Sequence, residues 1–315
     1  MMHRSILIKL VLTAFFWGLM FHLAKYTVTW MSPASIGGWR FLIAGAALIP
    51  FLHWQEGINW QGLRRNLPFL ILMSVIGICG FNISLFYGLR QTSPVNGALI
   101  VALAPAMTAI LSATLNRERI SPRQIVGFAL ALIGVAVVVS HGSLQALLSL
   151  HFSQGDALVL LASLGWAIYT VIPKRFIQGL APLQITTATI VMGAVAMSLF
   201  AQVTADDFFS LPPAGVVVAI VVMGLLGSAL SYIWWNDSIR ELGAAKGAIF
   251  MNLVPVFATL IGLGLGQRVS TAQLAGAVLV IVGVLISSVT PRVTNVLQIG
   301  QSRLAITRRI ITTGR

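Results

Sequence analysis

Few side chains in this sequence could do chemistry, and the interesting ones lie within long apolar runs. Arg40 lies inside such a run, where it could either snorkel outward or attract an anionic group such as a carboxylate. His22 lies deep in another run. An imidazole can carry a proton near neutral pH, although a hydrogen-bonded packing role is favoured. None of the 7 acidic residues lies mid-run, and Asp237 reaches only the end of one. The sequence therefore offers no carboxylate of the kind that proton-coupled pumps use.

Catalytic machinery is not recognisable either. An enzyme would need clustered groups, such as paired acids or a histidine and an acid at helical spacing, and a Gly-rich loop ending in Lys-Ser or Lys-Thr would bind nucleotide. The sequence contains neither pattern. The single cysteine, Cys79, excludes an intramolecular disulfide and a cysteine metal site. We therefore expect no catalytic residues, no metal and no cofactor.

Aromatic and amide side chains are the remaining candidates for a binding site. They could form aromatic walls with a few polar anchors, which suits an amphipathic metabolite. The alternative is that the tryptophans and tyrosines form interfacial belts, as Trp30, Trp54 and Trp60 are expected to do. With Arg40 and His22, the candidate substrate-binding residues are Trp17, Phe21, Asn82, Tyr87, Asn96, Trp166, Tyr169, Tyr232, Trp235, Asn236 and Asn252.

Composition shows which elements must position these residues. Hydrophobic residues make up 57% of the chain and charged residues 9%, with a mean hydropathy of +0.93, so lipid rather than water is the main solvent. A membrane helix needs about 20 apolar residues, and only helices or closed barrels satisfy their backbone groups in lipid. We predict an all-α membrane protein with ten spans, at residues 6–28, 34–54, 67–89, 95–115, 123–140, 156–176, 183–203, 213–235, 244–266 and 271–290.

The loops between these spans orient the bundle. Of the 20 Lys and Arg residues, only Lys25, Arg90 and Arg268 fall at the outer ends if the N-terminus is cytoplasmic, and Arg40 lies within a span. The loops at 141–155 and 204–212 contain no Lys or Arg. By the positive-inside rule, both termini are cytoplasmic. Because the basic residues are scattered between apolar runs, the net charge of +13 marks topology and not nucleic-acid binding.

The two halves of the chain repeat each other. Trp17 and Lys25 recur as Trp166 and Lys174, about 150 residues later. Pro105 in the fourth span matches Pro255 in the ninth, and each could be a static kink or a gate hinge. Because each repeat has five spans, an odd number, the second half must enter from the opposite side. We therefore predict two inverted five-helix repeats, an architecture of secondary transporters.

A family resemblance follows from an ordered set of short motifs. The chain resembles the drug/metabolite transporter superfamily, specifically its ten-span EamA-type bacterial members. The set comprises Phe16-Trp17-Gly18, Trp39-Arg40-Phe41, Asn96-Gly97-Ala98, Ala104-Pro105, Arg117-Glu118-Arg119, Trp235-Asn236, Gly243-Ala244-Ala245 and Pro255. One departure is that the family usually has an acid after both the fourth and ninth spans. Glu118 fits this pattern, but Gln267 ends the ninth.

The resemblance implies a function and a site. It implies a secondary transporter that moves a small metabolite, such as an amino acid, across the bacterial inner membrane, with export as the direction. It also implies that the first, third, fourth, sixth, eighth and ninth spans line a central cavity. The rival hypotheses are a membrane-embedded enzyme and a non-transporting channel or scaffold.

The expected domains are residues 1–140 and 156–290 as the two repeats, with a basic cytoplasmic tail at 291–315. The expected partners are a small-molecule substrate and the lipid bilayer. Monomer and homodimer both remain open.

Overall fold

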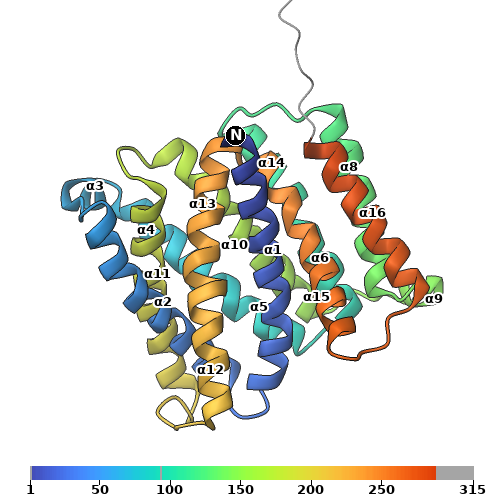
Figure 1. Cartoon of the computed structure of the whole chain (residues 1–315), viewed down its shortest axis with the longest axis horizontal. Coiled ribbons are helices and arrows are strands. Elements are labelled where there is room, and N and C mark those ends of the chain that lie inside the picture. Colours follow the sequence, from blue (N-terminus) through green and yellow to red (C-terminus); the bar gives the residue numbers. More distant parts are fainter. Residues whose placement is uncertain (1, 93, 289–315) are drawn as a thin grey trace, which may run out of the picture.

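The computed structural model describes residues 2–92 and 94–288; the predicted basic tail at 291–315 lies outside them. Within the described residues all regular elements are helical (Figure 1). Ten of these helices or helix runs are long and apolar enough to cross a membrane. Many of their large apolar side chains are exposed, such as Ile110 at 60% and Val278 at 59%, as lipid-facing surfaces require. The predicted fold class of an all-α membrane protein with ten spans is confirmed.

The first half contains five spans. They are α1 (Met2–Thr27); α2 (Pro33–Gln55); the third span, formed by α4 (Leu67–Leu72), the π-helix η1 (Met73–Gly80) and α5 (Phe81–Leu89); the fourth, formed by α6 (Pro94–Ala102) and α7 (Ala104–Leu115); and α8 (Pro122–Val139). A short helix, α3 (Trp60–Arg65), connects the second span to the third.

The second half follows the same order. After the short α9 (Leu144–Leu148) come α10 (Gln154–Phe176); α11 (Pro182–Thr204); the eighth span, formed by α12 (Ala214–Val222), the π-helix η2 (Met223–Leu230) and α13 (Ser231–Leu242); the ninth, formed by α14 (Ala244–Ala248), the 3-10 turn η3 (Ile249–Asn252) and α15 (Leu253–Gly264); and α16 (Thr271–Ser288). The eighth span extends past its predicted end at residue 235, so Asp237 and Arg240 are helical.

Local sequence signals explain several helix starts. Ser32 caps α2 and Ser121 caps α8, and in each helix a proline follows directly at the first position, where its missing N–H costs nothing. Ser121 and Gln124 form a complete capping box. These caps fix where α2 and α8 begin, at the start of their apolar runs.

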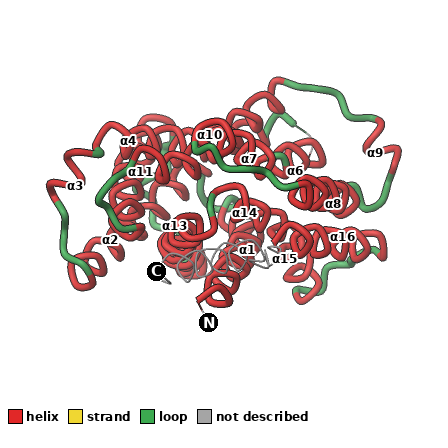
Figure 2. The backbone as a smooth tube through the Cα atoms, turned by 90° about the horizontal axis from the view of Figure 1, so that it is seen from above, coloured by secondary structure: helices red, strands yellow, loops and turns green. Residues whose placement is uncertain are grey.

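The two halves are related by a two-fold axis, and glycines mark where symmetry-related helices meet. At one end of the molecule α8 packs against α16, with Gly127 close to the Gly283 carbonyl and Gly134 close to the Gly276 carbonyl (Figure 2). The later residue of α8, Gly134, meets the earlier residue of α16, Gly276, so the two helices are antiparallel. At the other end α2 packs against α11. The predicted inverted repeat is confirmed by this geometry.

The irregular segments also follow the repeat. The π-helices η1 and η2 occupy equivalent positions in the third and eighth spans. Gly77 in η1 lets Tyr169 pack against the backbone, and Gly227 in η2 does the same for Met20. The fourth span breaks at Leu103 and the ninth at η3, in each case just before the paired proline. The sequence predicted the proline irregularities but not the π-helices, which often occur at functional sites.

Candidate functional site

A cluster of aromatic side chains occupies the interface between the two halves. Trp17 of α1 and Trp166 of α10, which are equivalent positions of the repeat, contact each other edge to face at 5.2 Å between ring centroids. Tyr232 and Trp235 of α13 contact both tryptophans, and Tyr169 stacks on Trp166 at 5.4 Å. Five of the predicted site residues therefore lie together, in contact with one another.

The two symmetry-related tryptophans differ in their hydrogen bonding. The Trp17 Nε1–H donates to the Gly227 carbonyl in η2 at 3.0 Å. The equivalent partner of Trp166 would be the carbonyl of Gly77 in η1, but the buried Trp166 Nε1 has no hydrogen-bond partner among the described residues. The two tryptophans are therefore equivalent in the sequence repeat but differ in their hydrogen bonds.

Asn236 belongs to the same cluster and fixes its edge. Its amide nitrogen donates to the Tyr169 hydroxyl at 2.9 Å and to the Thr186 hydroxyl at 2.8 Å. The Trp235 Nε1–H donates to the Thr170 hydroxyl at 3.3 Å. Through these bonds α13 is tied to both α10 and α11, so the polar atoms of this buried network have partners.

Arg40 and Asn82 form a second part of the site. Arg40 Nη2 donates to Asn82 Oδ1 at 2.8 Å, and the guanidinium lies over the Phe41 ring at 4.5 Å from its centroid. Phe41 in turn contacts Tyr232, which connects Arg40 to the aromatic cluster. Of the two interpretations left open by the sequence, the structure supports an inward-pointing Arg40, since Asn82 and Phe41 are both buried.

A cavity lies at the outer ends of the same helices, α2 and α5. It has a volume of about 80 Å³ and lies where α2 begins and α5 and α11 end, on the face opposite the N-terminus. Its walls include Ile83, Phe86, Tyr87 and Arg90 of α5. Tyr87, a predicted site residue, therefore lies at this mouth and not in the aromatic cluster.

Four other predicted residues lie away from the cluster. Phe21 is 58% exposed on α1. The His22 ring makes a 2.8 Å hydrogen bond with the Ala258 carbonyl, which supports its packing role. Asn96 donates to Asp156 and to the His151 carbonyl, beside a second cavity of about 370 Å³ on the same opposite face. Asn252 is buried in η3. Pattern alone could not assign these side chains to one helix face or another.

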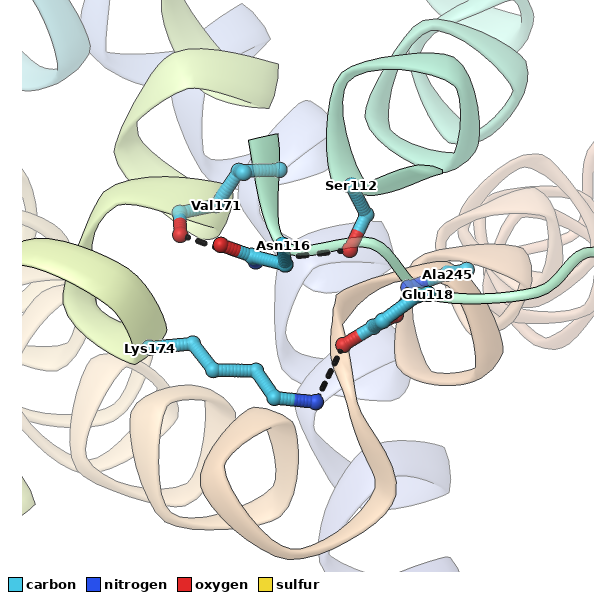
Figure 3. Close-up of polar contacts among 6 residues, drawn as sticks. All are labelled: Ser112, Asn116, Glu118, Val171, Lys174 and Ala245. Carbon is cyan, nitrogen blue, oxygen red and sulfur yellow. Dashed lines mark hydrogen bonds and ion pairs between the residues drawn. The ribbon is translucent and has the colours of Figure 1, made fainter. Parts of the chain in front are cut away.

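Glu118 connects the two halves on the N-terminal face (Figure 3). It follows α7, accepts a bond from the Lys174 ammonium at 2.6 Å, and accepts another from the Ala245 backbone N–H at 3.3 Å. Lys174 ends α10 and Ala245 begins α14, so one carboxylate joins three spans. The Lys174 ammonium therefore has a carboxylate partner at the end of its span.

The local backbone and the electrostatics both suit this contact. Gly243 has a φ of +86° and lies so close that an added Cβ would be 2.8 Å from Glu118 Oε1. Burial alone would raise the pKa of the Glu118 carboxyl, but hydrogen bonds from Lys174, Ser112 and Ala245 lower it below its ordinary value. Glu118 is therefore ionised in this arrangement, and we name Glu118, Lys174 and Ala245 the latch.

A second ion pair also ties α1 to the eighth span. The Lys9 ammonium contacts the Asp237 carboxylate at 2.5 Å, and Arg240 approaches the same carboxylate at 3.8 Å. Asp237 directly follows Asn236 in α13, and its carboxylate points to Lys9 and Arg240 and not to the aromatic rings.

These features define a ten-span helical membrane protein built from two inverted repeats, and comparison with known proteins identifies its family. The chain belongs to the EamA-like transporter family, whose sequence profile matches residues 4–140 and again residues 153–289. It is 42% identical to the uncharacterized transporter YyaM of Bacillus subtilis, over 91% of this chain and 95% of that protein.

More distant proteins share the architecture. A probable terminal-alkyne amino-acid exporter of Streptantibioticus cattleyicolor is 24% identical, over 88% of this chain and 91% of its own length. A solved crystal structure matches with a TM-score of 0.77 at 19% identity, covering 90% of this chain and 96% of that one. That structure supports the fold alone.

Proposed function

We propose that this protein is a secondary transporter that moves a small amphipathic metabolite, an amino acid or a similar compound, across the bacterial inner membrane by alternating access. Membership of a transporter family supports transport over a catalytic role. Export as the direction rests on the family and on the relative named an exporter. The aromatic cluster with Asn236 would contact the apolar body of the substrate.

The observation that carries the proposal is the unequal packing of the two faces. On the N-terminal face α7 packs against α14, and the latch bridges them. On the opposite face the equivalent helix halves are α15 and α6. Within the described chain they pack mainly on other helices, α15 on α1 and α6 on α8 and α10. Exchanging these two arrangements through the internal two-fold would close one face and open the other, which is what alternating access requires.

The direction of this state follows from the basic residues. If the N-terminal face is cytoplasmic, as the loop charges predict, the latch closes the cytoplasmic side and the cavity beside Tyr87 opens to the outside. Pro105 and Pro255, each at a helix break, would be the hinges of the exchange.

Counterflow in proteoliposomes tests this function. Metabolites that change in cells lacking or overproducing the protein would first identify candidate substrates. Vesicles preloaded with one unlabelled candidate should then accumulate the labelled form transiently and saturably, as a carrier does. Uptake that rises linearly with concentration would indicate a channel, and chemical conversion of the labelled compound would indicate an enzyme. If no changed metabolite gives counterflow, the transport proposal is wrong.

A further inference from the structure

Arg40 lies in the membrane-spanning part of the molecule, and no described residue forms an ion pair with it. It lies in the third turn of α2, and its Nε is buried with no hydrogen-bond partner among the described residues. Placing an unpaired charge at membrane depth is costly, and such residues usually face a protein interior or a water-filled path. Its one hydrogen-bond partner within the described residues, the Asn82 carbonyl oxygen, is neutral. The side chain is therefore held in place without being neutralised.

The carboxylates of the chain are all placed elsewhere. Glu118 and Asp237 are paired on the N-terminal face, and Asp156 bonds Thr92 and Asn96 on the opposite face. Asp207 accepts bonds from Ser32 and Ser35 at the start of α2. The others are Glu56, Asp206 and Glu241, and none of the seven forms an ion pair with Arg40 within the described chain.

The geometry leaves the guanidinium ready for one anion. Asn82 uses its amide nitrogen on the Ile78 carbonyl at 2.7 Å, which fixes its carbonyl oxygen toward Arg40. One guanidinium N–H is thereby occupied, while the Nε–H remains for a ligand. A carboxylate can bridge adjacent N–H groups of an arginine in a bidentate contact. A single arginine matches a single negative charge.

A cavity borders the residue that follows Asn82 in α5. The cavity between α2, α5 and α11 begins at Arg90 and Tyr87 and reaches Ile83, which is next to Asn82 in the chain. Its lining contains aromatic, apolar and hydroxyl groups and one cation, with no acid. The Phe41 ring continues from Arg40 to the aromatic cluster, so an anion on Arg40 could extend an apolar body toward Tyr232.

We propose that Arg40, oriented by Asn82, binds the carboxylate of the transported molecule, which makes the substrate an organic anion with an apolar or aromatic body. This inference rests on the proposed transport function for its biological meaning, but the binding can be measured without transport. Arg40 is then the residue that selects the charge of the substrate, and the tryptophans contact the rest.

Binding to purified protein in nanodiscs tests the proposal directly. The probes are phenylacetate, its neutral isostere phenylacetamide and phenylphosphonate, followed by tryptophan fluorescence. We expect phenylacetate to bind best and to lose about 10- to 100-fold in affinity in Arg40→Gln, the loss expected for a charge-assisted pair. Arg268→Gln, an exposed arginine on the same face, should leave binding unchanged. A preference for phenylphosphonate would replace the carboxylate by a phosphate-type group and overturn that assignment.

Asn82→Asp separates binding from a merely structural role. It leaves Arg40 in place but sets a carboxylate against the guanidinium, so phenylacetate should no longer bind although the protein still folds. If Arg40 only holds α2 against α5, this variant should bind phenylacetate as the unmodified protein does. The proposal fails if the unmodified protein binds no anion at millimolar concentration, or if phenylacetamide binds equally well. Binding without counterflow would refute transport and leave the anion site standing.

Discussion

The latch permits a quantitative prediction, because Glu118→Gln removes one charge and keeps the size of the side chain. The Lys174 side chain is 43% exposed, so its ion pair with Glu118 contributes at most about 1 kcal/mol. The Glu118 carboxylate is only 14% exposed, and its charge-assisted bond to the Ala245 N–H adds a further contribution of similar size. Together these contacts bias the closed N-terminal face by about 1–2 kcal/mol. The open-to-closed ratio should therefore rise about 5- to 30-fold in the variant.

Cysteine labelling measures this shift. Ala248 of α14 is fully buried on the N-terminal face, where α14 packs against α7. In a background with Cys79 replaced by serine, Ala248→Cys should react slowly with an impermeant maleimide applied to that face. Adding Glu118→Gln should raise the labelling rate by the factor given above.

The pH dependence of labelling follows from the same contacts. The closed latch holds the pKa of Glu118 below its ordinary value, and opening would return it toward that value. Closure is therefore fully stabilised above the ordinary pKa and is weakened as pH falls through the lowered one. Labelling of Ala248→Cys should accelerate on acidification, and Glu118→Gln should remove this dependence.

Three controls make the test decisive. Glu241→Gln removes an exposed acid at the end of α13 whose one ion pair among the described residues is with the adjacent Arg240, so labelling should not change. Lys174→Gln should resemble Glu118→Gln, and the double variant should exceed either single variant by little because they share one interaction. Unchanged labelling in both Glu118→Gln and Lys174→Gln would refute the assignment of this contact as a latch.

Three further predictions concern the symmetric centre and the scaffold. Trp17→Phe removes the hydrogen bond to Gly227 and should shift the equilibrium between the two transport states away from the present one by about 0.5–1.5 kcal/mol. Trp166→Phe removes no hydrogen bond from the present state and should shift the equilibrium the other way. Equal shifts in the labelling assay would show that the two tryptophans do not exchange hydrogen-bonding roles between the states. Pro105→Ala and Pro255→Ala should likewise bias labelling in opposite directions, and parallel or absent shifts would make the prolines packing features. Gly134→Ala would place a Cβ 2.7 Å from the Gly276 carbonyl and should lower the stability of the fold by about 1–3 kcal/mol. Gly264→Ala, with open space around it, should not. Equal melting temperatures for the two variants would argue against tight α8–α16 packing.

The sequence by itself determined the membrane fold and its internal symmetry. Apolar runs long enough to cross a bilayer can only be helices, because every backbone N–H and C=O must find a partner without water. The recurrence of Trp17 as Trp166 and of Pro105 as Pro255 then required an inverted repeat, since five spans return the chain to the other side. These arguments need only length, composition and order, so they survive without coordinates.

Only the tertiary structure decided which of the candidate residues meet. Phe21 and Trp17 are both aromatic and lie one turn apart on nearly the same face of α1. Phe21 is exposed whereas Trp17 packs on Trp166, because neighbouring helices cover one of these turns and not the other. Glu118 and Lys174 come from spans that are distant in sequence and meet only in the folded molecule. Arg40 of α2 is likewise oriented by Asn82 of another helix. The difference between the two faces has the same origin. Equivalent sequences in the two halves can make different contacts, and only the packing of the folded molecule decides which of the two faces is closed.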